Sequence, residues 1–530
     1  MPQANAQPRI RQLLPGGCAV AGLLAVCFVL LPDWLPPGVP GEWVWPRLAA
    51  PVDAAEWVER GLPCLICGLL LVAIALAGDR PQHRLNRWNR LVFLLLLAGG
   101  TVGWQAAAVS ATPSPHRELR WFWVNYDPWA TGYFLDAVSD QRSLTEFLGA
   151  YEAEVALGDV LHRGTHPPGL PLLNRLMLRM TRGSPGLSRA VLSFADGPAV
   201  ETFRSLERQA VLASPLTDAE LASLVLFSAA ALGCCGCLPV FVLLLLEPFC
   251  GYRCAWRSAV LTAGIPAVAV FLPRSDVHYA ASGCLLLLLI SRGKCSTARF
   301  PRLFAGACAG VWLFACLQVS LAHLPVLAAA GVWMFFGALE RPFSAWGNSV
   351  WRDVVWFWVV LFAALLGSAV IFGWLTGCRP WVVWRQNLIN HAAFYSEYPR
   401  TWWKWLLVNP LELFFAAGPP LALAGFAGVC ESLRKLFVRG SGEPLKTLAV
   451  SVFLVWLLLL FSGKNQGEAA RLWTFLTPWT ALCASAVLAA GGAGKGSGTG
   501  FSQGGWLLLV VAQLSCCALT TGRISGYLQL

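Results

Sequence analysis

The sequence predicts an all-α protein, a polytopic transmembrane helical bundle of about thirteen spans, with a large outer loop of short amphipathic helices after the third span. Three observations predict this fold class. The chain is 57% hydrophobic and only 13% charged over its 530 residues. Apolar runs recur along nearly its whole length, and Lys and Arg residues gather in the connections between them. Such a composition is typical of a multi-pass membrane protein.

The formal net charge of +11 could indicate a nucleic-acid-binding protein. Because the basic residues lie mostly between apolar runs, we expect membrane lipids as partners and no nucleic acid. Many of the 18 cysteines lie in apolar runs, where a thiol behaves as a small hydrophobic group. Cys64 and Cys67 form a CxxC pair without a second pair or nearby histidines, so no metal site is expected there.

Residues 1–110 are expected to form an N-terminal unit of three spans. The first apolar run, 17–31, follows two arginines and precedes Pro32 with no small-residue cleavage pattern, which predicts an uncleaved span. The aromatic, proline-rich stretch 32–47 suits the outer interface. Spans at 61–78 and 91–110 then flank a strongly basic connector, which is expected to be cytoplasmic.

Residues 111–217 are predicted to form the long outer loop, and residues 218–530 a C-terminal multi-span region. The glycine-rich stretch 491–500 predicts a flexible inner linker. Most Lys and Arg residues of the short connections fall on the side of the N-terminus, which predicts a cytoplasmic N-terminus in the plasma membrane. The expected C-terminal spans are 219–246, 259–272, 277–290, 303–323, 325–339, 354–375, 406–429, 448–461, 472–490 and 506–520.

With this topology, the unusual polar clusters of the chain all fall on the outer side. A catalytic or binding site at one membrane surface would collect polar groups there. The alternative is that outer loops are simply polar. The candidate site residues are Asp127, Asp136, His162, Arg163, His166, Arg175, Arg274, Asp276, His278, Glu468 and Arg471.

Asp127 and Asp136 lie soon after the third span. A carboxylate at that level can act as general base on an acceptor hydroxyl, or it can hold a divalent metal ion. Asp127 could instead cap a helix that begins at Pro128.

The segment 162–169, HRGTHPPG, places His162, Arg163 and His166 around a rigid turn. Arg175 and further arginines follow at helical spacing, which predicts an interfacial amphipathic helix that presents guanidinium groups to phosphates. The alternative is a membrane-surface anchor that binds no substrate.

Two further clusters stand at the ends of predicted spans. Arg274 and Asp276, with His278, could contact a substrate or pair with each other. Glu468 and Arg471 are three residues apart, so an internal ion pair is as compatible with the spacing as a role in binding.

The order of an outer aspartate, a GYF aromatic pair, a second acidic residue and a basic residue before Pro-Pro resembles the GT-C superfamily of integral-membrane glycosyltransferases. The resemblance is to the branch with protein O-mannosyltransferases and the lipid A aminoarabinose transferase. Asp127 and Asp136 match its two acidic positions, and His166 matches its basic-Pro-Pro element. Two departures are visible, because the acidic residues are not adjacent and three spans precede the acidic loop.

The resemblance implies a polyprenyl-phosphate sugar as donor and a lipid, glycan or protein hydroxyl as acceptor. An outer-loop Asp would be the base, and transfer would invert the anomeric centre. No cofactor is certain, and a divalent metal ion is compatible with the carboxylates. The alternatives are a transporter or lipid flippase and a non-catalytic scaffold; no Walker-type motif is present, which disfavours an ATP-driven pump.

Overall fold

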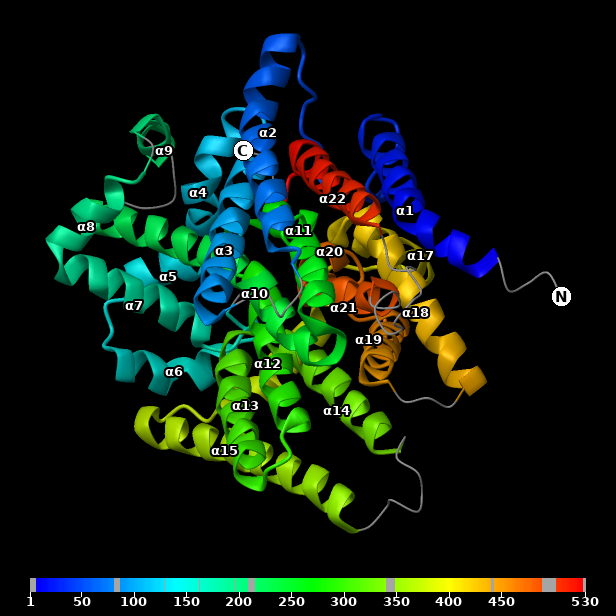
Figure 1. Cartoon of the computed structure of the whole chain (residues 1–530). Coiled ribbons are helices and arrows are strands. Elements are labelled where there is room, and N and C mark those ends of the chain that lie inside the picture. Colours follow the sequence, from blue (N-terminus) through cyan, green and yellow to red (C-terminus); the bar gives the residue numbers. More distant parts are fainter. Residues whose placement is uncertain are drawn as a thin grey trace.

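The computed structural model describes residues 6–80, 86–128, 130–161, 163–195, 197–207, 215–339, 348–439, 443–488 and 502–527. Within these ranges the chain is almost entirely helical, which confirms the predicted all-α class (Figure 1). Two short strands, β1 (Gly38–Val39) and β2 (Trp43–Val44), pair antiparallel in the loop after the first helix.

The first three long helices are α1 (Ala6–Leu30), α2 (Ala54–Gly78) and α3 (Arg87–Val109). Two of them begin where a polar side chain accepts a hydrogen bond from the first turn. Asp53 accepts from the Glu56 amide and Asn86 from the Asn89 amide, and such caps satisfy amides that have no partner within the helix.

Six short helices follow, as the sequence predicts. In Figure 1 they lie together beside the long helices, and α7 and α8 pack against α10. A capping box at Ser143 and Glu146 fixes the start of α6. The bounds are α4 (His116–Tyr126), α5 (Tyr133–Ser139), α6 (Leu144–Ala156), α7 (Gly169–Gly183), α8 (Pro185–Leu192) and α9 (Gly197–Glu207).

The 45-residue helix α10 (Asp218–Thr262) is broken at Gly251, where φ is 75° and ψ is 162°. Beyond the break, Arg253 and Arg257 form ion pairs of 2.9 and 2.8 Å with the buried Asp79 that ends α2. This charge cluster fastens the far end of α2 to the second half of α10. The next elements are α11 (Pro266–Phe271), α12 (Val277–Cys295) and α13 (Arg299–Val319).

The remaining elements complete the bundle. Helix α15 packs on α13, α18 packs on α21, and α22 packs on α1, so the first and last helices lie side by side. The bounds are η3 (Leu321–His323), α14 (Leu324–Leu339), α15 (Asn348–Thr376), α16 (Pro380–Glu397), α17 (Trp402–Ala417), α18 (Pro419–Arg439), α19 (Pro444–Phe461), α20 (Ala469–Leu472), η5 (Thr474–Leu476), α21 (Thr477–Leu488) and α22 (Gln503–Arg523).

The number of spans differs from the expected thirteen. Among the described residues, nine helices are long and apolar enough to cross a membrane, or ten if the pair α17 and α18 is one span bent by 112°. The difference has local causes. Helix α12 carries Arg292 and Lys294, α21 has 12 residues, and the predicted run 259–272 is divided between the end of α10 and the six-residue helix α11. The predicted linker 491–500 lies outside the described residues.

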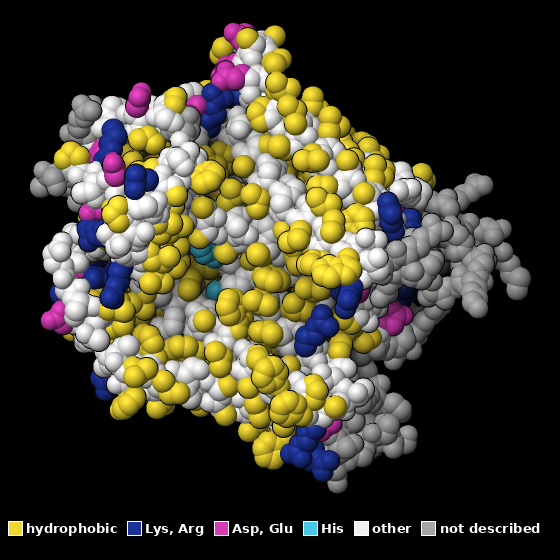
Figure 2. All heavy atoms as spheres, turned by 60° about the vertical axis from the view of Figure 1, so that its left-hand side comes forward, with side chains coloured by type: hydrophobic (Ala, Val, Ile, Leu, Met, Phe, Trp, Pro, Cys, Tyr) yellow, Lys and Arg dark blue, Asp and Glu magenta, His cyan; other side chains and the backbone are white. Residues whose placement is uncertain are grey.

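Large apolar side chains are exposed on the long helices. Leu24, Leu69, Leu95 and Leu366 are each about 60% exposed. Figure 2 shows hydrophobic side chains over much of one face, with charged side chains mainly around its margins. A chain that exposes this much apolar surface on membrane-length helices is an integral membrane protein.

Candidate active site

A cavity of about 380 Å³ forms where segments distant in the sequence meet. Five of the predicted site residues line it, namely His166, Arg274, Asp276, Glu468 and Arg471. The remaining lining residues are Glu42, Trp43, Trp45, Pro46, Ala130, Thr131, Tyr133, Leu161, Ser275, Phe394, Tyr398, Arg400, Leu472, Gly526 and Tyr527.

Arg274 lies in the turn between α11 and α12 and is only 5% exposed. Its guanidinium group makes no hydrogen bond to any described residue, and its Nε is fully buried. Burial, together with the repulsion of Arg471, lowers the pKa of Arg274 to about 10, so the group stays charged at neutral pH. A buried cation without a hydrogen-bonded counter-ion is unfavourable, and an anion in the cavity would relieve this.

Arg471 and Glu468 form an ion pair of 3.1 Å, and Asp276 lies 4.0 Å from Arg471. Burial acts to lower the pKa of Arg471, but the attraction of Glu468 and Asp276 outweighs it and raises this pKa. Glu468 has a left-handed backbone, with φ 60° and ψ 19°. Such a conformation in a non-glycine residue stores strain and often marks a functional position.

His166 reaches the cavity from the turn that the HPPG sequence predicts. Its Nδ1 is 3.0 Å from the Thr165 hydroxyl, and its ring meets the Tyr133 ring edge-on at 5.8 Å. Tyr151 donates a 3.0 Å hydrogen bond to the His166 carbonyl. A side chain at Gly164 would collide with the carbonyl of Asp159, so only glycine fits this turn.

Two buried amides of α16 hold the same turn from the other side. Asn387 and Asn390 donate hydrogen bonds of 2.7 and 2.8 Å to the Gly164 carbonyl. The turn that carries His166 is therefore fixed by side chains more than two hundred residues away along the chain. His162 lies outside the described residues.

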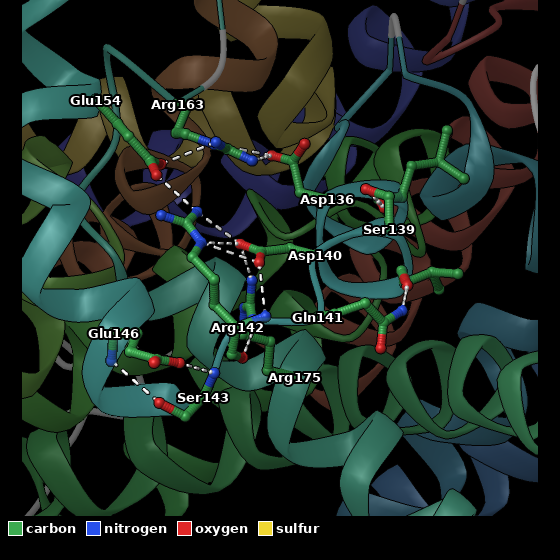
Figure 3. A network of polar contacts seen from close by, with 12 residues as sticks. Asp136, Ser139, Asp140, Gln141, Arg142, Ser143, Glu146, Glu154, Arg163 and Arg175 are labelled. Carbon is green, nitrogen blue, oxygen red and sulfur yellow. Dashed lines mark hydrogen bonds and ion pairs between the residues drawn. The ribbon is translucent and has the colours of Figure 1, made fainter.

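Three predicted residues do not line the cavity and lie in an ion-pair network instead (Figure 3). Arg163 bridges Asp136 and Glu154 at 2.8 Å each. Arg175 pairs with Asp140, and its guanidinium carbon stands 4.1 Å from the centre of the Phe147 ring. These pairs join α5, α6 and α7 to one another.

Asp127 ends α4, and its amide donates a 2.7 Å hydrogen bond to the Trp123 carbonyl. The alternative that Asp127 caps a helix beginning at Pro128 is therefore wrong, because the next helix begins at Tyr133. The chain turns after Asp127 and enters the cavity wall at Ala130, and the attraction of the Asp127 carboxylate offsets part of the lowering that burial imposes on the pKa of Arg274.

His278 is placed apart from the cavity lining. Its ring stacks on Phe227 at 5.8 Å within the bundle, and its Nε2 has no hydrogen bond to a described residue. His278 follows Asp276 by only two residues, but two residues of an α-helix rotate a side chain by about 200°, so the ring points away from the cavity.

Glu42 and Arg400 line the cavity but are not among the site residues predicted from the sequence. Glu42 accepts hydrogen bonds from Thr401 Oγ1 at 2.6 Å, the Trp405 indole at 2.8 Å and Lys404 at 3.1 Å. Burial acts to raise its pKa, yet these donors lower the pKa of Glu42 to about 2. The aromatic stretches around both residues were the available signal, although such stretches are equally typical of a membrane interface.

Arg400 donates to the Glu42 carbonyl, and its guanidinium carbon lies 5.6 Å from the centre of the Trp43 ring. The β1–β2 loop is thereby clamped onto the start of α17. This clamp brings Arg400 to the cavity as a third guanidinium beside Arg274 and Arg471.

A second cavity of about 350 Å³ adjoins the first, and Trp45 lines both. Its wall is apolar except for Glu412 of α17 and Thr520 of α22. Space for a charged group and space for a hydrocarbon chain therefore lie side by side, which suits an amphiphilic ligand.

A divalent metal ion would need several oxygen or nitrogen ligands placed around one point. The described part of the chain holds no group of three or more His, Cys, Asp or Glu residues placed to bind a metal ion. Glu468 and Asp276 lie against Arg471 instead.

Comparison with known proteins gives a distant match. No protein-family model and no curated protein matches the chain. The fold is similar to the crystal structure of the Archaeoglobus fulgidus oligosaccharyltransferase in complex with Zn and sulfate, at 14% sequence identity and a TM-score of 0.40. The match covers 73% of this chain and 54% of that one, so the chain spans about half the length of that protein. Similarity of this degree does not establish a family.

Proposed function

We propose that this protein is a membrane glycosyltransferase that transfers a sugar from a polyprenyl-phosphate donor to an acceptor hydroxyl at the outer face of the membrane. The main support for the proposal is the position of Arg274. Its buried guanidinium group faces the cavity and has no hydrogen bond to a described residue. Arg400 and Arg471 line the same cavity. Guanidinium groups match the geometry and charge of a phosphate, which supports a phosphate-bearing ligand there.

The adjoining apolar cavity supports a lipid-linked donor. A polyprenyl phosphate carries its hydrocarbon chain directly on the phosphate, and the apolar space begins at Trp45, which also lines the charged cavity. The side chain of Tyr398, which is 41% exposed, offers a hydroxyl group to a sugar beside the phosphate, whereas the Tyr527 hydroxyl donates to the His116 carbonyl.

Asp127 is the proposed general base. The acceptor oxygen attacks the anomeric carbon from the face opposite the phosphate and passes its proton to the Asp127 carboxylate. The bond between the anomeric carbon and the phosphate oxygen breaks, and the electron pair leaves with the phosphate. Arg274, Arg400 and Arg471 stabilise the charge that develops on the leaving phosphate, and the anomeric centre inverts.

Asp136 is a weaker candidate for the base. Neither aspartate lines the cavity, but the Asp136 carboxylate pairs with Arg163, whereas that of Asp127 lies near enough to Arg274 to act on its charge. The outer position of the site and the cytoplasmic N-terminus belong to the same proposal, which rests on the distribution of Lys and Arg along the sequence.

The test uses the full-length protein in lipid nanodiscs with a panel of polyprenyl-phosphate sugars. We expect wild type to release sugar from one donor, and Asp127→Asn to lower kcat by about 100-fold or more. Asp136→Asn is the matched control. It should keep most activity, because Arg163 still has its ion pair with Glu154 and the network stays in place. Arg274→Gln should weaken donor binding by about 10-fold or more. Full activity of Asp127→Asn would exclude it as the base.

A transporter or lipid flippase is the second candidate, and the break between α17 and α18 favours it, because transporters often use broken helices. A transporter predicts movement of the labelled lipid across a vesicle membrane without cleavage of its sugar-phosphate bond. Thin-layer analysis of the lipid after incubation separates the two functions.

A further inference from the structure

Glu412 is a buried carboxylate that the proposed reaction does not use. It lies in α17, within an apolar stretch of sequence, and is 8% exposed. Its Oε2 accepts a 3.2 Å hydrogen bond from the Ala470 amide, and its Oε1 is buried without a hydrogen-bond partner among the described residues. Burial of a carboxylate in such surroundings costs free energy, and residues of this kind in membrane proteins usually have a structural or functional role.

The Ala470 amide belongs to the four-residue helix α20, which carries Arg471 into the cavity. Amides in the first turn of a helix have no acceptor within that helix. Glu412 supplies one of these acceptors from a separate helix. The Glu468 carbonyl, just before α20, accepts from the amides of Arg471 and Leu472 at 2.9 Å each. The contact at Ala470 therefore holds the turn whose first residue is the left-handed Glu468.

The loop before α20 is held by the neighbouring helices as well. Asn465 is also left-handed, with φ 58°, and its carbonyl lies 3.4 Å from the Asn409 side-chain amide of α17. The Tyr395 hydroxyl of α16 accepts a 2.9 Å hydrogen bond from the Gln466 amide. Two left-handed non-glycine residues within four positions persist only where surrounding contacts impose them.

We propose that Glu412 is a positioning residue that fixes the backbone of Glu468 and thereby sets the Glu468–Arg471 ion pair in the cavity. This inference rests on the proposed function for its effect on transfer, but the contact itself is independent of any reaction. Glu412 touches neither the phosphate nor the sugar in this scheme. It also lines the apolar cavity, but its effect on the charged cavity passes through the Ala470 amide of α20.

The test compares Glu412→Gln, whose amide oxygen can still accept from the Ala470 amide, with Glu412→Leu, which has a similar volume and no acceptor. Hydrogen–deuterium exchange of the segment 465–473 is measured in nanodiscs, without substrate. We expect exchange in this segment to rise about 10-fold or more in Glu412→Leu and to stay near wild type in Glu412→Gln. Asn409→Leu should raise exchange in the same segment through loss of its contact with Asn465, and Glu412→Ala, which also lacks an acceptor, replaces Glu412→Leu if that variant does not fold.

Transfer kinetics provide the second readout. Glu412→Leu should lower kcat about 10-fold or more, and Glu412→Gln should restore most of it. The double variant Glu412→Leu with Glu468→Gln should be no slower than Glu468→Gln alone, because both changes act on one pair. Multiplicative losses would overturn the inference, as would unchanged exchange in Glu412→Leu. If wild type transfers no sugar, the proposed function fails, and the exchange result alone decides the role of Glu412.

Discussion

Three arginines line the charged cavity, and their neighbours give them different properties. Arg471 has Glu468 and Asp276 close by, and Arg400 donates to the Glu42 carbonyl. Arg274 has no hydrogen bond to a described side chain or carbonyl. Because a charged group in a poorly hydrated site interacts most strongly with an incoming anion when its donors are free, Arg274 is the expected primary contact of a phosphate.

The hydrogen bonds to Glu42 make the stability of the fold depend on pH. Its pKa falls from 4.5 to about 2 on folding, so its contribution to stability is complete above about pH 4.5 and is lost as the pH falls toward 2. We expect Glu42→Gln to lower the melting temperature at pH 7, and the difference from wild type to shrink progressively below pH 4.5. Thermal unfolding in detergent at a series of pH values measures this.

Glu201→Gln, at an exposed position of α9, is the matched control for the Glu42 experiment. A difference between Glu42→Gln and wild type that is constant from pH 7 to pH 3 would show that the hydrogen bonds to Thr401 and Trp405 do not depend on the charge of Glu42.

The bend between the helices α17 and α18 depends on one glycine and one buried glutamine. Gly418 has φ 91°, and a side chain there would collide with the amide of Gln513 in α22. Gln513 donates to the carbonyls of Ala417 and Gly264 at 2.8 and 3.0 Å and accepts from the Leu421 amide at 3.1 Å. A single buried side chain therefore satisfies the backbone groups that the bend exposes.

Gly418→Ala is expected to destabilise the fold by about 1–3 kcal/mol, because alanine is strained at positive φ and Gln513 would have to move. Gly331→Ala is the control, since Gly331 lies within α14 and a side chain there meets open space. Alanine at that helical position should be neutral or slightly stabilising. Equal unfolding free energies for the two variants would contradict this account of the bend.

At the scale of the whole molecule, the cavity lies at one end of the helices. Helix α12 begins beside Asp276 and runs 19 residues to Cys295, about 28 Å at 1.5 Å per residue. This length is close to the thickness of the hydrocarbon core of a bilayer. The two basic residues that keep α12 out of the nine most apolar helices of the described residues lie in its last turn, where long basic side chains reach the lipid headgroups. Cys295 is therefore expected at the membrane surface opposite to the cavity.

Labelling in intact cells tests this arrangement together with the proposed orientation. The side chain of Leu157, in the polar segment near the cavity, is 86% exposed. We expect Leu157→Cys to react with a membrane-impermeant maleimide added outside, whereas the exposed native Cys295 should react only after permeabilisation. The reverse pattern would place the cavity on the cytoplasmic side.

Sequence alone predicted the class of the fold and five of the twenty residues that line the cavity. Apolar composition and helical length follow from local chemistry, so the all-α membrane bundle and the short helices between α3 and α10 could be predicted. Arg274 with Asp276 and Glu468 with Arg471 stood out because charges are unfavourable at the ends of apolar runs. The structure places these four residues around one cavity.

Only the tertiary structure decided which charges are paired. Arg163 and Arg274 look alike in the sequence, yet Arg163 bridges two carboxylates and Arg274 faces a cavity. The clamp between Glu42 and Trp405 joins residues 363 positions apart, and no local pattern marks it. Pairing depends on distances that the packing of helices sets, whereas composition and periodicity act within one element. The sequence therefore determined the membrane bundle and its candidate charges, and the packing decided which of them remain available to a ligand.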